Sequence, residues 1–170
     1  MRYQVVVLDS EIGTAITIND LLWKRAPSGH VTDQGFYNDF KIYMGYTTRD
    51  ILEPDFDSNY VPGSKTLVFS RSTYTLSGLV PDAWFTTPLD TPFFYNGSGN
   101  LLIDIEWTSA PESNSIFIWN WNTNQLGRAM FATPEGPTGS PEETLPYMIL
   151  GGTNDLESET FARIKTMFAK

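Results

Sequence analysis

LDTPFFYNGSGNLLIDIEW, residues 89–107, is the most sharply patterned stretch of the chain. Its centre, residues 96–100, holds two glycines, which supply the positive φ angles that a tight reversal of the backbone needs. After the reversal the residues alternate between two faces of an extended strand, with Leu101, Ile103, Ile105 and Trp107 on one face and Leu102, Asp104 and Glu106 on the other. The stretch therefore predicts two antiparallel strands joined by a turn, the second with one face in a core and one in water.

Similar apolar or alternating runs recur along the chain, separated by segments rich in Gly, Pro and polar residues. They predict strands at residues 3–8, 14–24, 40–44, 66–74, 83–89, 101–107, 115–121, 128–133 and 145–150. The expected fold is all-β, an antiparallel β-sandwich of about nine strands of the jelly-roll or immunoglobulin-like kind. This domain is expected to span residues 1–152, with a long polar loop at residues 47–64.

The C-terminal residues 153–170 break the strand pattern and predict a linker followed by a short amphipathic helix. Phe161, Ile164, Met167 and Phe168 gather on one face of that helix. Because a short helix is marginally stable alone in water, its apolar face must dock. Two interpretations stay open: the helix packs on its own sandwich, or it mediates self-association by inserting into a neighbouring copy.

The composition excludes several classes of protein. The chain has 170 residues, enough for one domain with a core, and no cysteine, so disulfides and thiolate zinc sites are excluded. His30 is the single histidine, so a multi-histidine metal site is excluded as well. The net charge of −9, with no basic block, disfavours nucleic-acid binding. No apolar run approaches the roughly 18 residues of a membrane-spanning helix.

Asp104 and Glu106 are the sharpest catalytic candidates, because they are two carboxylates on one face of a strand. Their spacing of about 6.5–7 Å along the strand overlaps the separation of the two carboxylates of glycosidases. Acidic residues on the solvent face of a strand are common, however, and we favour that interpretation. The sequence contains no nucleophile elbow and no phosphate-binding glycine motif. We therefore expect no catalytic residues and no enzyme activity.

Two further groups are candidate binding residues. Asp55, Asp57 and Asn59 place oxygen side chains at alternate positions, as in the first half of a calcium loop, although Tyr60 stands where that loop needs glycine. A polar turn is the favoured interpretation, calcium is kept as the alternative, and no other cofactor is expected. Trp119 and Trp121 form a candidate platform for sugar rings, although large aromatic residues more often fill a core.

Several segments together resemble one family of modules: SEIG at 10–13, TIND at 17–20, FKIYMGYT at 40–47, LVFS at 67–70 and, above all, residues 89–107. The chain resembles, over residues 3–150, a β-sandwich module of large secreted or cell-surface proteins from Bacteroidetes-like and candidate-phylum bacteria. Such modules often neighbour fibronectin type III, immunoglobulin-like or sorting domains. The resemblance implies an extracellular or cell-surface location and carries over no catalytic residue.

These observations favour a non-catalytic, extracellular structural or adhesive module, in one version a self-assembling surface or filament subunit. Its expected partners are neighbouring copies or sister domains, with no nucleic acid and no membrane span. The alternative is a carbohydrate-binding module of a secreted multidomain protein, whose partner would be a polysaccharide.

Overall fold

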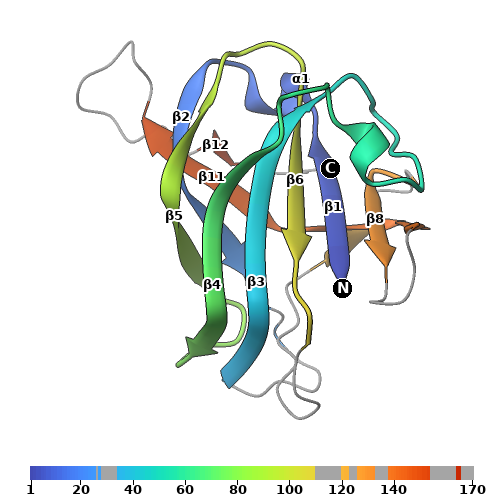
Figure 1. Ribbon diagram of the computed structural model, residues 1–170. Helices are drawn as coiled ribbons and strands as arrows, with labels where there is room; N and C mark the ends of the chain where they lie inside the picture. Colours follow the sequence, from blue (N-terminus) through green and yellow to red (C-terminus); the bar gives the residue numbers. More distant parts are fainter. Residues whose placement is uncertain are drawn as a thin grey trace.

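The computed structural model describes residues 1–25, 27, 34–109, 120–122, 126–132, 138–153 and 164–165. These residues form mostly β-strands, with two short helical turns (Figure 1). In chain order the elements are β1 (Arg2–Val7), α1 (Asp9–Ile12), β2 (Ile16–Lys24), β3 (Gln34–Thr47), the 3-10 turn η1 (Asp57–Asn59), β4 (Thr66–Ser77), β5 (Trp84–Tyr95), β6 (Asn100–Glu106), β7 (Asn120–Asn122), β8 (Ala129–Ala132), β9 (Ser140–Glu142), β10 (Thr144–Pro146), β11 (Met148–Thr153) and β12 (Ile164–Lys165).

The described strands form two large antiparallel sheets and one small one. The six-stranded sheet has the order β4-β3-β6-β1-β8-β9, and the four-stranded sheet has the order β12-β11-β2-β5. A two-stranded sheet joins β10 to β7. The two large sheets face each other in Figure 1 and share one apolar core, so the predicted all-β sandwich is confirmed.

The core between the sheets is built by the inward residues of alternating strands. Leu101, Ile103 and Ile105 of β6 are buried, and β2 contributes Ile18 and Leu21 from the opposite sheet. β2 carries a bulge at Asn19, because the register of β2 against β5 shifts between Ile18 and Asp20. This shift keeps both Ile18 and Leu21 on the inner face although their spacing is odd.

The turn between β5 and β6 has the backbone that the sequence predicts. Gly97 and Gly99 have φ angles of 82° and 77°, in the left-handed region that side chains rarely adopt. A Cβ atom on Gly97 would lie 2.8 Å from the main-chain nitrogen of Ala15, so the turn also packs too tightly for a side chain there. Tyr95 donates a hydrogen bond to the Gly99 carbonyl at 2.6 Å and closes the turn.

Several strands extend beyond their predicted bounds, and β3 and β5 do so most. β3 begins at Gln34, six residues before the strand predicted at 40–44, and β5 continues through Pro92 to Tyr95. Proline has no N–H group to donate to a neighbouring strand. β5 tolerates Pro88 and Pro92 because it is the outermost strand of its sheet and pairs with β2 alone among the described strands.

The predicted C-terminal helix is wrong at the two residues of that segment that the structure describes. Ile164 and Lys165 form β12, which pairs antiparallel with Leu150 and Ile149 of β11. Hydrogen bonding to a sheet edge has replaced the helical pattern at these positions. The other predicted self-association residues, Phe161, Met167 and Phe168, lie outside the described residues.

Candidate functional site

The outer face of the six-stranded sheet is covered by residues 48–65, which we call the covering segment. It contains η1 and lies beside β1 and β8 in Figure 1. Leu52 and Phe56 of this segment are buried and form a second apolar core against the sheet. The sheet residues of this second core are Val6, Leu102, Met130 and Ala132. The prediction that the outer face of β6 meets water is therefore wrong at Leu102.

Main-chain hydrogen bonds hold the covering segment to the sheet and its loops. The Leu52 N–H group donates to the Gly127 carbonyl at 2.8 Å, and the Val61 N–H group donates to the Tyr46 carbonyl at 2.8 Å. The carbonyl of Pro54 accepts a hydrogen bond from Gly139 at 2.7 Å. Such pairing satisfies backbone groups that burial would otherwise leave without a partner.

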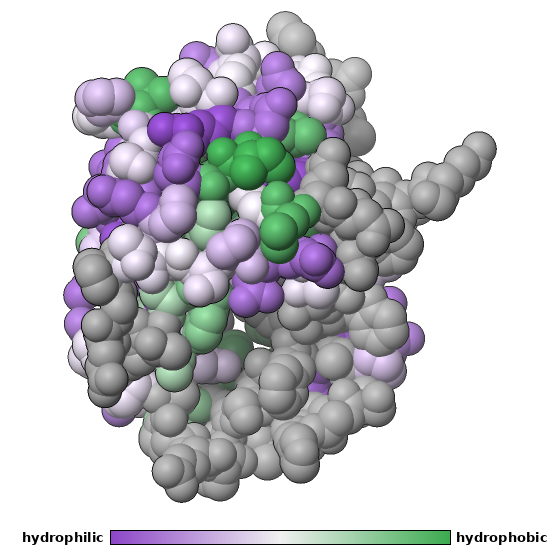
Figure 2. All heavy atoms as spheres, turned by 90° about the vertical axis from the view of Figure 1, so that its right-hand side faces the viewer, coloured by the Kyte–Doolittle hydropathy of each residue, from purple (hydrophilic) through white to green (hydrophobic). Residues whose placement is uncertain are grey.

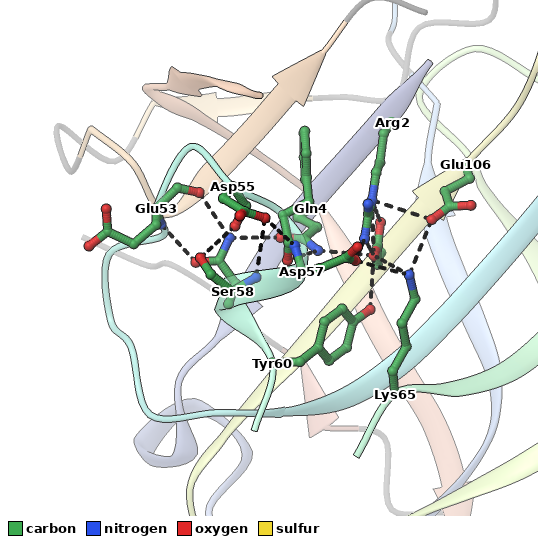
Figure 3. A network of polar contacts seen from close by, with 12 residues as sticks. Arg2, Gln4, Glu53, Asp55, Asp57, Ser58, Tyr60, Lys65 and Glu106 are labelled. Atoms are coloured by element: carbon green, nitrogen blue, oxygen red, sulfur yellow. Dashed lines mark hydrogen bonds and ion pairs between the residues drawn. The ribbon is translucent and has the colours of Figure 1, made fainter. Parts of the chain in front are cut away.

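Asp104 of β6 is the centre of a polar network, whose members Arg2, Gln4, Tyr60 and Lys65 are labelled in Figure 3. Its side chain is fully buried, with 0% exposure. Arg2 donates from Nη2 to Oδ2 at 2.6 Å and from Nε to Oδ1 at 3.0 Å. Gln4 Nε2 and the Tyr60 hydroxyl each donate to Oδ2 at 2.9 Å. The prediction that Asp104 lies on a solvated face is therefore wrong: the carboxylate is enclosed by four donor atoms.

The pairing of β1 with β6 creates this arrangement. Arg2 is opposite Glu106, and Gln4 is opposite Asp104. Directly opposed residues of an antiparallel pair share a face, so donor side chains of β1 meet the carboxylates of β6. Opposite charges in such positions stabilise the pairing.

Lys65 closes the network on its exposed side. Its Nζ atom lies 3.3 Å from Glu106 Oε1, 3.5 Å from Asp57 Oδ1 and 3.6 Å from Asp104 Oδ2. The ammonium group also lies over the Tyr43 ring, 4.4 Å from the centroid. Two cations, Arg2 and Lys65, thus face three carboxylates, so the network carries one more negative than positive charge.

A chain of amide contacts connects this network to η1. Asn59 is buried and donates from Nδ2 to Gln4 Oε1 at 3.0 Å and to the Glu53 carbonyl at 2.9 Å. Its Oδ1 atom accepts the Glu53 N–H at 2.7 Å, and Gln4 donates to the Phe56 carbonyl at 3.0 Å. The covering segment is therefore fixed to β1 by buried hydrogen bonds, which are costly to leave unmade.

The environment of the network shifts three pKa values. Burial, followed by the charge and hydrogen bond of Asp104, raises the pKa of Tyr60, so its hydroxyl stays a donor. Burial acts to lower the pKa of Arg2, but the hydrogen bond and charge of Asp104, together with Asp57 and Glu106, outweigh it and raise the pKa. The hydrogen bond from Arg2 lowers the pKa of Asp57. These shifts favour a neutral Tyr60 hydroxyl and the ion pair between Arg2 and Asp57.

The geometry does not suit acid–base chemistry at Asp104 and Glu106. A general acid or base needs a proton-transfer position open to substrate, whereas Asp104 has no exposed surface and its oxygens are occupied by Arg2, Gln4 and Tyr60. Glu106 is 30% exposed but is paired with Arg2 and Lys65 at 3.3 Å each. The two carboxylates share the same cations instead of facing each other across a cavity.

The three residues proposed for calcium binding do not converge. Asp55 Oδ1 accepts the N–H groups of Asp57 and Ser58, so it caps η1. Asp57 points toward Arg2 and Lys65, and the amide of Asn59 is occupied by Gln4 and Glu53. Among the described residues, no group of three or more His, Cys, Asp or Glu side chains could hold a metal ion. The local pattern is the polar turn that the sequence also allowed.

The side chains of the predicted sugar platform lie outside the part of the chain that the structure describes. Trp119 lies outside the described residues, and of Trp121 the structure describes the backbone, which pairs with Leu145 in the two-stranded sheet. Sequence reasoning missed two exposed rings on β5, Trp84 and Phe94, which are 42% and 54% exposed. Ten residues of strand separate them, roughly 33 Å, so they do not form one platform.

The network residues Arg2, Gln4, Tyr60 and Lys65 were also missed. Their only signal in the sequence is that Arg2 and Gln4 alternate on one strand as Asp104 and Glu106 do on another. Recognising the match requires knowing that β1 pairs with β6, across about a hundred residues of chain.

Comparisons of the chain with protein-family models, with curated proteins and with solved structures give no match. Within the part of the chain that the structure describes, no helix is long and apolar enough to cross a membrane. The functional argument therefore depends on the fold and on the chemistry of the described residues.

Proposed function

We propose that this chain is a non-catalytic structural or adhesive β-sandwich module of an extracellular or cell-surface protein. The observation that carries the proposal is the enclosed state of Asp104. The best catalytic candidate in the sequence serves instead to fix the covering segment to the sheet through Arg2, Gln4 and Tyr60. A network of this kind makes a rigid wall in which the oxygens of Asp104 are occupied by donors.

The surface supports an adhesive role. Ile51 of the covering segment and Leu126, beside β8, are each about half exposed, and Ile51 Cγ2 would lie 2.8 Å from a Cβ atom on Gly127. Figure 2, a view onto the side where η1 and β8 lie, shows an apolar patch within a mainly hydrophilic surface. Exposed apolar patches on otherwise polar proteins often mark contacts with other proteins.

The partner in this proposal is a neighbouring copy or a sister domain, and residues 158–170 mediate self-association. In the structure, the described part of this segment pairs with the edge of β11 through two residue pairs, Ile149 with Lys165 and Leu150 with Ile164. A sheet edge can accept a strand from its own chain or from another chain. Because this pairing is short, it supports a contact that can be exchanged between copies of the chain.

Negative-stain electron microscopy and analytical ultracentrifugation test this version. The full chain is expected to form oligomers or fibres, and a chain that ends at residue 157 is expected to stay monomeric. A chain that ends at residue 165 retains β12 and is the matched control. Unchanged assembly after removal of residues 158–170 would contradict the self-association model.

The rival function is carbohydrate binding, which the exposed indole of Trp84 favours. Flat exposed rings stack on sugars. A pull-down with insoluble polysaccharides would separate the two functions. Binding that is lost in Trp84→Ala, Trp119→Ala or Trp121→Ala, with the far-ultraviolet circular dichroism unchanged, would favour the rival.

A further inference from the structure

The turn between β5 and β6 brings together an electrophile and a nucleophile that the proposed function does not use. Asn96 and Gly97 are both exposed, and they form the sole Asn-Gly pair in the sequence. The Asn96 main-chain N–H is bound by the Tyr46 hydroxyl at 2.9 Å, whereas its carboxamide faces the turn. Asparagine is among the chemically labile residues of proteins.

The turn activates the Asn96 carboxamide. The Ser98 N–H group donates to Asn96 Oδ1 at 2.9 Å, which folds the side chain back along its own main chain. A donor at this oxygen stabilises the negative charge that develops there when Cγ is attacked. Among the described residues, the Gly97 N–H makes no hydrogen bond, so this nitrogen is available to lose its proton and attack. Because residue 97 is glycine, no side chain shields the nitrogen.

We propose that Asn96 is a site of spontaneous modification, through a cyclic imide, to aspartate and isoaspartate. The Gly97 nitrogen forms a bond to Asn96 Cγ and gives up its proton, and the bond from Cγ to Nδ2 breaks. Nδ2 leaves as ammonia, carrying that proton. Water then adds to one of the two imide carbonyls, and either C–N bond of the ring opens to give a carboxylate. No oxidant, reductant or metal is required.

Aspartate and isoaspartate fit the turn differently. Aspartate keeps the acceptor oxygen that Ser98 binds, and adds one negative charge to an already acidic chain. Isoaspartate lengthens the main chain by one carbon next to Gly97, whose Cα already lies so close to Ala15 that a Cβ atom would be 2.8 Å from the Ala15 nitrogen. The isoaspartate form is therefore expected to displace this turn from the loop after α1.

The test is incubation of the folded full chain at mildly alkaline pH, followed by peptide mapping with mass spectrometry. Asn96 is expected to convert at least about tenfold faster than any other asparagine, a difference of about 1.4 kcal/mol in activation free energy. Asn59 is an internal control, because its carboxamide is buried and held by Gln4 and Glu53. The Asn96→Gln variant should remain unmodified at this position, and Asn96→Asp marks the elution of one product.

The same incubation in concentrated urea shows whether the folded turn supports the reaction. Conversion of Asn96 in the folded chain at a rate within about tenfold of the unfolded rate supports the proposal. If folding slows Asn96 by more than that factor, or if another asparagine converts first, the proposal is overturned.

Discussion

Substitution of Asp104 by alanine removes the acceptor of four donor atoms, two from Arg2 and one each from Gln4 and Tyr60. Breaking a buried ion pair on one side costs about 3–5 kcal/mol, because the remaining charge is left without its partner. Arg2 keeps Asp57 at 2.7 Å and Glu106 at 3.3 Å. We therefore expect a loss near the lower end of that range, about 3 kcal/mol of unfolding free energy.

Urea unfolding, followed by tryptophan fluorescence, measures this loss. With a slope of about 2 kcal/mol per molar urea, the midpoint should fall by about 1.5 M. Asp104→Asn should also destabilise the chain. The amide nitrogen Nδ2 is a hydrogen-bond donor, and in this position it would face other donors and find no acceptor. The matched control is Glu106→Gln, since Glu106 lies on the same strand but is 30% exposed, and its ion pairs should contribute about 1 kcal/mol or less. If both Asp104 variants unfold within about 0.5 kcal/mol of the unmodified chain, the network does not stabilise the fold as we describe.

Three further predictions concern the covering segment. Phe56→Ala empties part of the second core and should cost about 3–5 kcal/mol in the same urea assay, whereas a cost below about 1 kcal/mol would mean that the segment packs loosely. Because the pKa of Tyr60 is raised in the folded state, its contribution is complete below the unfolded pKa of about 10 and is lost as pH rises toward the folded pKa. Stability measured at alkaline pH should therefore decline less steeply in Tyr60→Phe than in the unmodified chain, and parallel curves would contradict this. Because Arg2 lowers the pKa of Asp57, the contribution of Asp57 is present above its unfolded pKa of about 3.9 and is lost as pH falls through the folded pKa. Asp57→Asn should accordingly lose less stability on acidification, and an unchanged acid profile would show that this pair is not formed in solution.

The sequence was sufficient for the elements whose signals are local. The glycines at 97 and 99 predict the turn, and the alternation at 101, 103 and 105 predicts the inner face of β6. Both follow from backbone sterics and the period of a strand, which act over a few residues.

The outer face of β6 could not be predicted in this way. Alternation at Leu102 and Asp104 is equally compatible with solvent and with a second buried layer, because the strand pattern describes orientation and not what covers it. The cover is supplied by Leu52 and Phe56, about fifty residues earlier in the chain. The loop length was the one hint, since long loops often have a role in compact domains.

The prediction of a C-terminal helix was wrong for a different reason. Phe161, Ile164 and Met167 have helical spacing, but a pattern over so few residues competes with an available sheet edge. β11 offers that edge, and Ile164 and Lys165 pair with it. At the two residues that the structure describes, hydrogen bonding to β11 therefore determines the backbone conformation, and the helical spacing of the side chains does not.

Native-state hydrogen exchange of the covering segment tests the central claim most directly. The claim is that residues 48–65 form a fixed layer over the six-stranded sheet and enclose Asp104. The amides of Leu52 and Val61 donate to Gly127 and Tyr46 at 2.8 Å each. The account predicts that both exchange with free energies of opening close to those of the β6 amides, in one cooperative unit. Exchange of both amides as fast as in an exposed loop, with β6 still protected, would contradict the account. Asp104 would then again be a candidate catalytic residue.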